Sequence, residues 1–309
     1  MIDMTHIPVL MNESIEALDI KPAGTYVDAT LGGGGHTRQI LDRLTTGRLY
    51  AIDKDDYALE RARRELSDHR LTLIKSDFRY ISERLFELGA PSPNGVLFDL
   101  GVSSFQLDDG ERGFSYMHDA PLDMRMDRNS GKSARDVVNE MPAAELMKVI
   151  SEYGEERYAS RIATAIDRER KIKPIETTFE LSQIIKDAMP AHARNEKQHP
   201  AKRTFQAIRI EVNDELAAVG EAVEKASDML APGGRIAVIT FHSLEDRIVK
   251  KIFQQMAKGC ICPPDFPQCV CGIKPKLKII NSKPYLPSDD EITKNPRSRS
   301  AKLRAAERL

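Results

Sequence analysis

The sequence lacks any uncharged apolar run near the roughly 20 residues that a membrane-spanning helix needs. Its first residues show no basic segment followed by an apolar core, so no targeting peptide is expected. With 41% hydrophobic and 30% charged residues in 309, the chain can bury a full core. We therefore expect a cytoplasmic protein without membrane contact.

Cysteine and net charge are also scarce. All four cysteines fall between Cys260 and Cys271, so no disulfide framework can be spread over the fold. The net charge of −1 gives no general argument for binding nucleic acid, and leaves only local basic patches to look for.

Short apolar runs alternate with helical patterns from Thr25 onward. We predict strands at Tyr26–Thr30, Leu49–Asp53, Leu71–Ser76, Gly95–Leu100 and Arg235–Phe241. Such alternation is typical of βαβ units and a parallel sheet, so the fold is predicted as α/β. A further strand near Lys278–Ile280 and the segment 300–309 are expected to supply the last edge of the sheet.

The alternation stops after Leu100, and helical patterns without a convincing strand occupy Ser133 to about Phe205. We expect a mainly helical insertion for substrate recognition over residues 105–210. The sheet domain would then be discontinuous, formed by residues 1–104 and 211–309.

A strand runs into four glycines, Gly32 to Gly35, and then into a helix. Glycine allows a ligand to approach the backbone closely, although a glycine-rich turn can also serve chain reversal alone. Asp53 ends the next strand, about 20 residues on, where a carboxylate can accept hydrogen bonds from a ribose diol. Asp77 and Phe78 end the third strand, where a polar group and a ring can flank an adenine.

The glycine spacing does not fit G-x-G-x-x-G, because the third position falls on Thr37 or Arg38. No G-K-[ST] ending is present either, which argues against a phosphate-binding P-loop. An adenosine cofactor without pyrophosphate fits better, and S-adenosylmethionine is the commonest of these.

Asp99 ends the fourth strand, where amino-methylating enzymes carry an acidic or amide residue. A cytosine amine has a delocalised lone pair, so acceptors must hold its hydrogens and orient the nitrogen. We assign Asp99 as the catalytic residue.

The chain resembles the ribosomal RNA small subunit methyltransferase H, or MraW, family over nearly its whole length. The resemblance rests on segments in a fixed order: 6–10, 32–36, 99–108, 111–115, 121–127, 153–157, 199–210, 241–247 and 295–300. It implies a class I (Rossmann-like) methyltransferase sheet, mostly parallel, with a helical insertion domain.

The resemblance also implies N4-methylation of a cytidine in the decoding region of small-subunit (16S) ribosomal RNA, within the assembled subunit. A homodimer is compatible with it. The cofactor contacts then fall on Gly34, Gly35, His36, Asp53, Phe78, Asp99 and Gln106. The chain departs from the family pattern before Gln106, where it has Phe105 instead of proline.

Several segments are candidates for facing the RNA. The stretch 111–127 either forms a lid or anchors the insertion by burying its methionines. Basic clusters at 199–209 and at Arg297, Arg299, Lys302, Arg304 and Arg308 either contact phosphates or are solvated. Ser243 is expected to cap a helix with Asp246, and His242 is expected to be structural rather than catalytic.

Cys260, Cys262, Cys269 and Cys271 are candidate zinc ligands. Their C-x-C spacing is tighter than the common C-x-x-C, so we assign no metal and expect a proline-rich loop with thiols. Three alternative functions stay open: a non-catalytic RNA-binding ribosome assembly factor, an amine methyltransferase acting on DNA or protein, and, least favoured, a nicotinamide dehydrogenase.

Overall fold

The computed structural model describes residues 8–194, 198–263, 266–268 and 270–309. The chain divides into two compact units, one formed by Met1–Gly101 and Leu216–Leu309, the other by Val102–Glu215. The first unit thus combines two segments that are far apart in the sequence. The expected insertion, 105–210, lies within the second unit.

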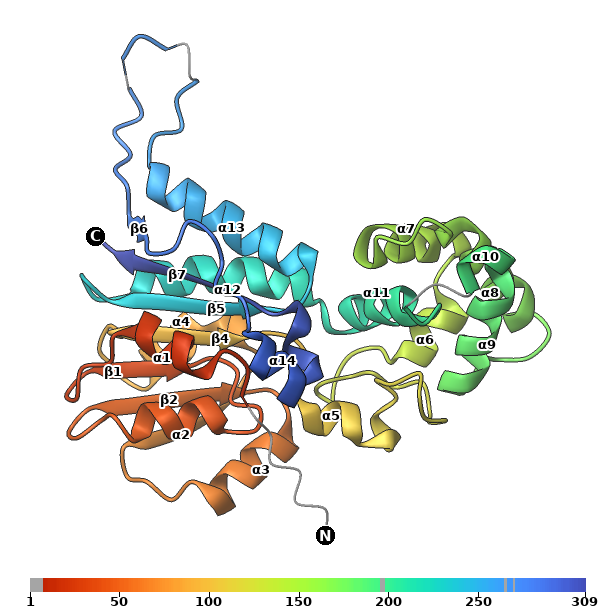
Figure 1. Cartoon of the computed structure of the whole chain (residues 1–309), viewed down its shortest axis with the longest axis horizontal. Coiled ribbons are helices and arrows are strands. Elements are labelled where there is room, and N and C mark those ends of the chain that lie inside the picture. Colours follow the sequence, from red (N-terminus) through yellow and green to blue (C-terminus); the bar gives the residue numbers. More distant parts are fainter. Residues whose placement is uncertain (1–7, 195–197, 264–265, 269) are drawn as a thin grey trace. The chain divides into compact units, whose positions relative to one another are not determined.

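The first unit is built on a seven-stranded sheet with the order β3-β2-β1-β4-β5-β7-β6 (Figure 1). Its strands are β1 Thr25–Asp28, β2 Arg48–Asp53, β3 Leu71–Lys75, β4 Gly95–Asp99, β5 Arg235–Thr240, β6 Leu277–Ile279 and β7 Lys302–Arg308. Strands β1 to β5 pair in parallel, whereas β7 is antiparallel to both β5 and β6. The predicted mostly parallel α/β sheet is confirmed, and its edge is β6 with β7 lying inside.

Helices surround this sheet. They are α1 Met11–Leu18, α2 Gly35–Leu41, α3 Asp56–Glu65, η1 Phe78–Tyr80, α4 Ile81–Glu87, α12 Glu215–Met229, α13 Ser243–Lys258, α14 Asp289–Lys294 and η3 Pro296–Ser300. The sequence analysis did not predict α1. No helix in the described ranges is long and apolar enough to cross a membrane.

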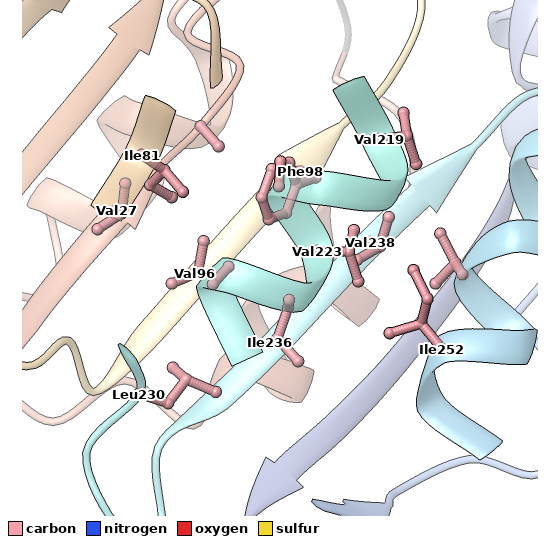
Figure 2. Packing of buried hydrophobic residues seen from close by; sticks show 14 of the residues in the cluster. Val27, Ile81, Val96, Phe98, Val219, Val223, Leu230, Ile236, Val238 and Ile252 are labelled. Atoms are coloured by element: carbon pink, nitrogen blue, oxygen red, sulfur yellow. The ribbon is translucent and has the colours of Figure 1, made fainter. Parts of the chain in front are cut away.

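Helices cover both faces of the sheet. Successive residues of each strand point to opposite faces, so one strand contributes to two buried clusters. Val96 and Phe98 of β4 belong to a buried cluster with α4, α12 and α13. Figure 2 shows side chains of α12, among them Val219 and Val223, lying over β4 and β5. Leu97, between Val96 and Phe98, packs instead with α1 and α2. The continuous apolar runs of the strands therefore reflect burial on two sides.

Strand β1 lies between β2 and β4, so the direction in which strands are added to the sheet reverses there. Ligands of open α/β sheets bind outside the carboxyl ends of the strands at such a reversal. The carboxyl ends of β1, β2 and β4 are the places where the glycine loop, Asp53 and Asp99 occur. The topology thus brings these three segments to one edge of the first unit.

The second unit is helical. It contains α5 Ser104–Asp108, η2 Gly110–Arg112, α6 Ala134–Glu140, α7 Ala143–Gly154, α8 Ala159–Arg170, α9 Thr178–Ala188, α10 Ala191–Arg194 and α11 Lys202–Asn213. Capping boxes begin α6 at Ser133 and α9 at Thr177. The helices enclose a separate apolar core that includes Leu146, Ile162 and Phe205.

Candidate active site

The glycine loop connects the end of β1 at Asp28 with the start of α2 at Gly35. Gly34 is the N-cap of α2 and has φ 75°, in the left-handed region that a side chain disfavours. Its N–H donates to the carbonyl oxygen of Leu31 at 2.7 Å, which closes a tight turn. Glycine is therefore required here by the backbone itself.

Asp53 ties the glycine loop to the end of β2. Its Oδ2 accepts the N–H of Gly32 at 2.9 Å, and its Oδ1 accepts the N–H of Asp55 at 2.9 Å. Burial raises the pKa of Asp53 to about 6, although these two hydrogen bonds act against the rise. The carboxylate is only partly covered, so each oxygen still has a lone pair with which to accept a hydroxyl from a ligand.

Asp99 is held at the end of β4 by its backbone N–H, which donates to Thr30 Oγ1 at 2.6 Å. Its side-chain Oδ2 lies 3.6 Å from Nδ1 of His36, a residue of α2 that is 5% exposed. Its Oδ1 is buried and has no hydrogen-bond partner among the described residues. Burial first, then repulsion from Asp28 and Glu245, raises the pKa of Asp99 to about 8.

The buried Oδ1 of Asp99 lowers the stability of the fold, because a buried polar atom without a partner loses its hydrogen bonds to water and gains none in return. The cost is understandable if a bound ligand supplies the missing hydrogen bond. A raised pKa that comes from burial plus nearby charges is also typical of functional sites.

Asp28 and Thr37 support this edge and were missed by the sequence analysis. Asp28 Oδ2 accepts the hydroxyl of Thr37 at 2.6 Å, and Oδ1 accepts the N–H of Thr30 at 3.1 Å. Asp28 is 1% exposed, and burial raises its pKa. The only sequence signal was its position directly before the glycine loop, since the pairing with Thr37 depends on how the loop folds.

Phe78 begins the short helix η1 and is half-buried. Its ring packs edge-to-face on Phe98 of β4, with the ring centres 5.9 Å apart. Asp77 is the N-cap of η1: it accepts the N–H of Arg79 at 2.9 Å and lies 3.4 Å from Lys54. Phe98 therefore holds the ring on one side, and Asp77 caps the helix η1.

Gln106 belongs to the second unit, so it is described apart from the other predicted cofactor contacts. It is buried and forms a capping box with Ser103 at the start of α5: its side chain accepts the N–H of Ser103 at 3.0 Å. Its predicted contact with a cofactor stays a prediction.

Comparison with known proteins supplies the family. The model of the MraW methylase family matches residues 3–309. The chain belongs to this family. Curated relatives named ribosomal RNA small subunit methyltransferase H occur in Brevibacillus brevis, with 57% identity over 98% of both chains, and in Carboxydothermus hydrogenoformans, with 56% identity over 99% of both. A relative of the same name in Heliobacterium modesticaldum is 54% identical over 98% of both chains. The predicted membership is confirmed.

One capping prediction for this MraW methylase is wrong. His242, not Ser243, is the N-cap of α13, and Glu245, not Asp246, completes the capping box. His242 Nδ1 accepts the N–H of Glu245 at 3.4 Å, and Glu245 Oε2 accepts the N–H of Phe241 at 2.8 Å. The shift by one residue occurs because Ser243 already has helical conformation. His242 thus has the structural role that was expected of it.

Arg304 also differs from the hypothesis that it contacts phosphate. It is 8% exposed, and its Nε and Nη2 donate to the two carboxylate oxygens of Asp246 at 2.6 and 3.2 Å. Among the other C-terminal cations, Arg297 and Arg299 are exposed. The sequence could not tell these apart, because Arg304 meets Asp246 only through the pairing of β7 with β5, whereas Arg297 and Arg299 lie in η3 before that strand.

The stretch 111–127 is anchored in the core of the second unit. Arg112 is 4% exposed and donates from Nη2 to the carbonyl oxygens of Arg125 and Met126, both at 3.0 Å. Met124 is fully buried, and Arg125 forms a bidentate ion pair with Asp123 at 2.9 Å. These contacts match the anchoring alternative rather than a lid.

Proposed function

We propose that this MraW methylase transfers a methyl group from S-adenosylmethionine to the N4 amine of a cytidine in the decoding region of small-subunit ribosomal RNA. One observation carries the proposal: Asp99 ends β4 beside the glycine loop with a buried Oδ1 that has no partner among the described residues. The relatives' names supply the RNA, and the resemblance supplies the N4 position.

The residues at this edge fit an adenosine cofactor. The glycine loop leads from the end of β1 into the start of α2 at Gly35, Asp53 can accept the ribose hydroxyls, and the half-buried ring of Phe78 can cover an adenine. When bound, S-adenosylmethionine supplies a methyl group on a positively charged sulfonium. A positive charge near Asp99 would lower the pKa of this acid and favour its carboxylate form.

Asp99 then acts as the acceptor for the target amine. Its Oδ1 takes a hydrogen bond from the exocyclic N–H, which orients the nitrogen and stabilises the positive charge that develops as the N–C bond forms. His36, 3.6 Å from Oδ2, helps to fix the carboxyl group. Because the amine proton becomes acidic during bond formation, no strong base is needed.

We propose that the second unit recognises the RNA. Its pocket lined by Arg157, Tyr158, His199 and Arg203 combines cations with rings. Arg157 lies over the ring of Tyr158 at 4.8 Å, and Tyr116 stacks on His199 at 4.4 Å. Unstacked RNA bases are commonly held between such aromatic and guanidinium planes. Such an enzyme would work on assembled small subunits in the cytoplasm.

The test is transfer of labelled methyl from S-adenosylmethionine to small ribosomal subunits that lack the modification, followed by nucleoside analysis. We expect labelled N4-methylcytidine, and a loss of about a hundredfold or more in rate for Asp99→Ala, which removes the acceptor. Asp42→Ala changes an exposed aspartate of the same unit and should keep the wild-type rate.

Several results would contradict the proposal. Label in DNA or protein would favour an amine methyltransferase of another substrate class, and binding of the subunit without turnover would favour an assembly factor. Transfer to naked ribosomal RNA as fast as to the assembled subunit would contradict the choice of particle.

The cofactor assignment has a separate test in Asp53→Asn. The variant loses the charge and replaces one of the two oxygens that accept the N–H groups of Gly32 and Asp55 by a donor, so we expect S-adenosylmethionine to bind about tenfold more weakly by titration calorimetry. Unchanged affinity would remove Asp53 from the cofactor site, whatever the substrate.

A further inference from the structure

A long loop joins the end of α13 to β6 and extends away from the sheet (Figure 1). Its base is closed: the N–H of Lys276 donates to the carbonyl oxygen of Met256 at 2.8 Å. At Gly259, with φ 70°, a Cβ atom would lie 2.5 Å from the backbone nitrogen of Pro275. The outgoing and returning arms thus pass each other closely, which only glycine allows.

Three thiols converge above this base. The Sγ atoms of Cys260, Cys262 and Cys271 all lie within 4.8 Å of one another, and those of Cys260 and Cys271 are 3.8 Å apart. A disulfide requires about 2.05 Å between sulfurs. Two thiolates on one tetrahedral zinc, at Zn–S of about 2.3 Å, are about 3.8 Å apart. The observed separation is too long for a disulfide and fits two ligands of one metal ion.

The loop has no apolar core among its described residues: its apolar side chains are exposed, and its cysteines are the partly buried residues. Among the described residues from 260 to 276, the three cysteines are partly buried and every other residue is exposed. Ile261, Phe266 and Val270 are 75%, 51% and 73% exposed. Since the apolar side chains point outward, their packing cannot hold the thiols together.

We propose that Cys260, Cys262 and Cys271 bind one Zn²⁺ ion as thiolates. The ion would cross-link the two arms of the loop and so replace the missing core. Each thiol loses its proton when it binds the metal, and a protein donor in the fourth position would close the site, as in structural zinc sites. Cys269, the remaining zinc candidate, lies outside the described residues.

The sequence alone argued against this assignment, because the C-x-C spacing is tight. The structure answers that argument: close approach of the arms at Gly259 lets Cys271 face Cys260 from the opposite arm. Cysteines from both arms then meet around one point. An iron–sulfur cluster uses the same kind of ligands, so the metal itself must be identified.

The experiment uses the full chain, produced with zinc available and purified under reducing conditions. Elemental analysis should find one zinc per chain, and release by a thiol-blocking mercurial should be followed with a metal indicator dye. In the metal-free chain, added Co²⁺ should give the thiolate charge-transfer absorption and the intense d–d bands of tetrahedral sites.

The variants make the test specific. Cys262→Ser removes one ligand and should weaken zinc binding by about a hundredfold or more. Ile261→Ser introduces the same residue at the neighbouring exposed position and should bind zinc like the wild type. None of these readouts depends on methyl transfer, so they are independent of the proposed function.

The assignment is overturned by a reduced chain that takes up no zinc and gives no tetrahedral cobalt spectrum. It is equally overturned by iron in place of zinc, or by equal zinc affinity in Cys262→Ser and the wild type. A Cys260–Cys271 disulfide that forms while zinc is present in excess would show that the pair is a redox site instead.

Discussion

Two mostly buried acids lie near the carboxyl ends of neighbouring strands in the first unit, and they differ in whether an arginine pairs with them. Asp99, at the end of β4, has a side chain that is 19% exposed, with Oδ1 unpartnered among the described residues and a pKa raised to about 8. Asp246, in the first turn of α13 after β5, has a side chain that is 13% exposed and is held by Arg304 at 2.6 Å. Burial is the largest influence on Asp246 and acts to raise its pKa as well, but the hydrogen bonds and charges of Arg304 and Lys302 together outweigh it, so the pKa lies below its ordinary value.

The comparison separates structural from functional carboxylates by whether the chain itself supplies a charged partner for the buried acid. Burial makes both acids unfavourable as anions, and a guanidinium supplied by the chain itself resolves the cost for Asp246. Among the described residues, Asp99 faces His36 at 3.6 Å in place of a guanidinium, and its Oδ1 has no hydrogen-bond partner. Its cost is left for a ligand to resolve, which is why we place the chemistry there.

The largest effect on this comparison is expected from Arg304→Met. It leaves Asp246 as a buried charge without its main partner, so the free energy of unfolding should fall by about 3 kcal/mol or more, measured by denaturant titration. Lys302→Met is the matched control, because Lys302 is 39% exposed and 3.3 Å from the same carboxylate. Its loss should be within about 1 kcal/mol. Equal losses would show that Asp246 does not depend on Arg304.

A pH-dependent difference is expected from Asp99→Asn. The folded pKa of about 8 lies above the ordinary value of 3.8, so the folded chain keeps a proton that the unfolded chain releases. The wild type should therefore lose unfolding free energy as the pH rises from about 4 toward 8, and the variant should lose less. Denaturant titrations across this range give the difference, in which the effect of Asp53 cancels. A constant difference between the two proteins would mean that the pKa of Asp99 is not raised.

The smallest effect is expected from His242→Ala, which tests the cap next to Asp246. Loss of the side chain that accepts the N–H of Glu245 should cost about 1 kcal/mol of unfolding free energy, in line with other helix caps. Ser243→Ala should cost less, because Ser243 is the first helical residue and not the cap. A larger cost for Ser243→Ala would restore the capping role that the sequence assigned to it.

The sequence predicted the elements whose burial is two-sided. Strands such as β4 and β5 are continuous apolar runs, and each is bounded by turn residues or by a polar residue at its carboxyl end. Asp53 and Asp99 could be placed at the sheet edge for the same reason, since parallel strands end on one side. The helix α1 was not predicted, because it is short and begins after Leu10, whose φ of 50° is not indicated by any sequence pattern.

Features that depend on register or on distant pairing could not be predicted. Arg304 and Asp246 are 58 positions apart, and they meet because of how β7 pairs with β5. The bond between Asp28 and Thr37 needs the actual path of the glycine loop. The spacing of the cysteines in the long loop argued against a zinc site, because the sequence does not show that the two arms of the loop meet at Gly259.

The pairing of β4 with β5 has a consequence for how the protein is made. Asp99 of β4 lies beside Ile239 of β5, so the strand that carries the acid gains its second neighbour only after the whole of the second unit has been synthesised. Strand β5 in turn can pair with β7 only after β7, which ends at Arg308, has been synthesised. Such long-range contacts fold slowly, because the chain between them must first be ordered or looped out. Translation therefore exposes a half-built sheet for most of its course, and the acid gains its burial among the last events.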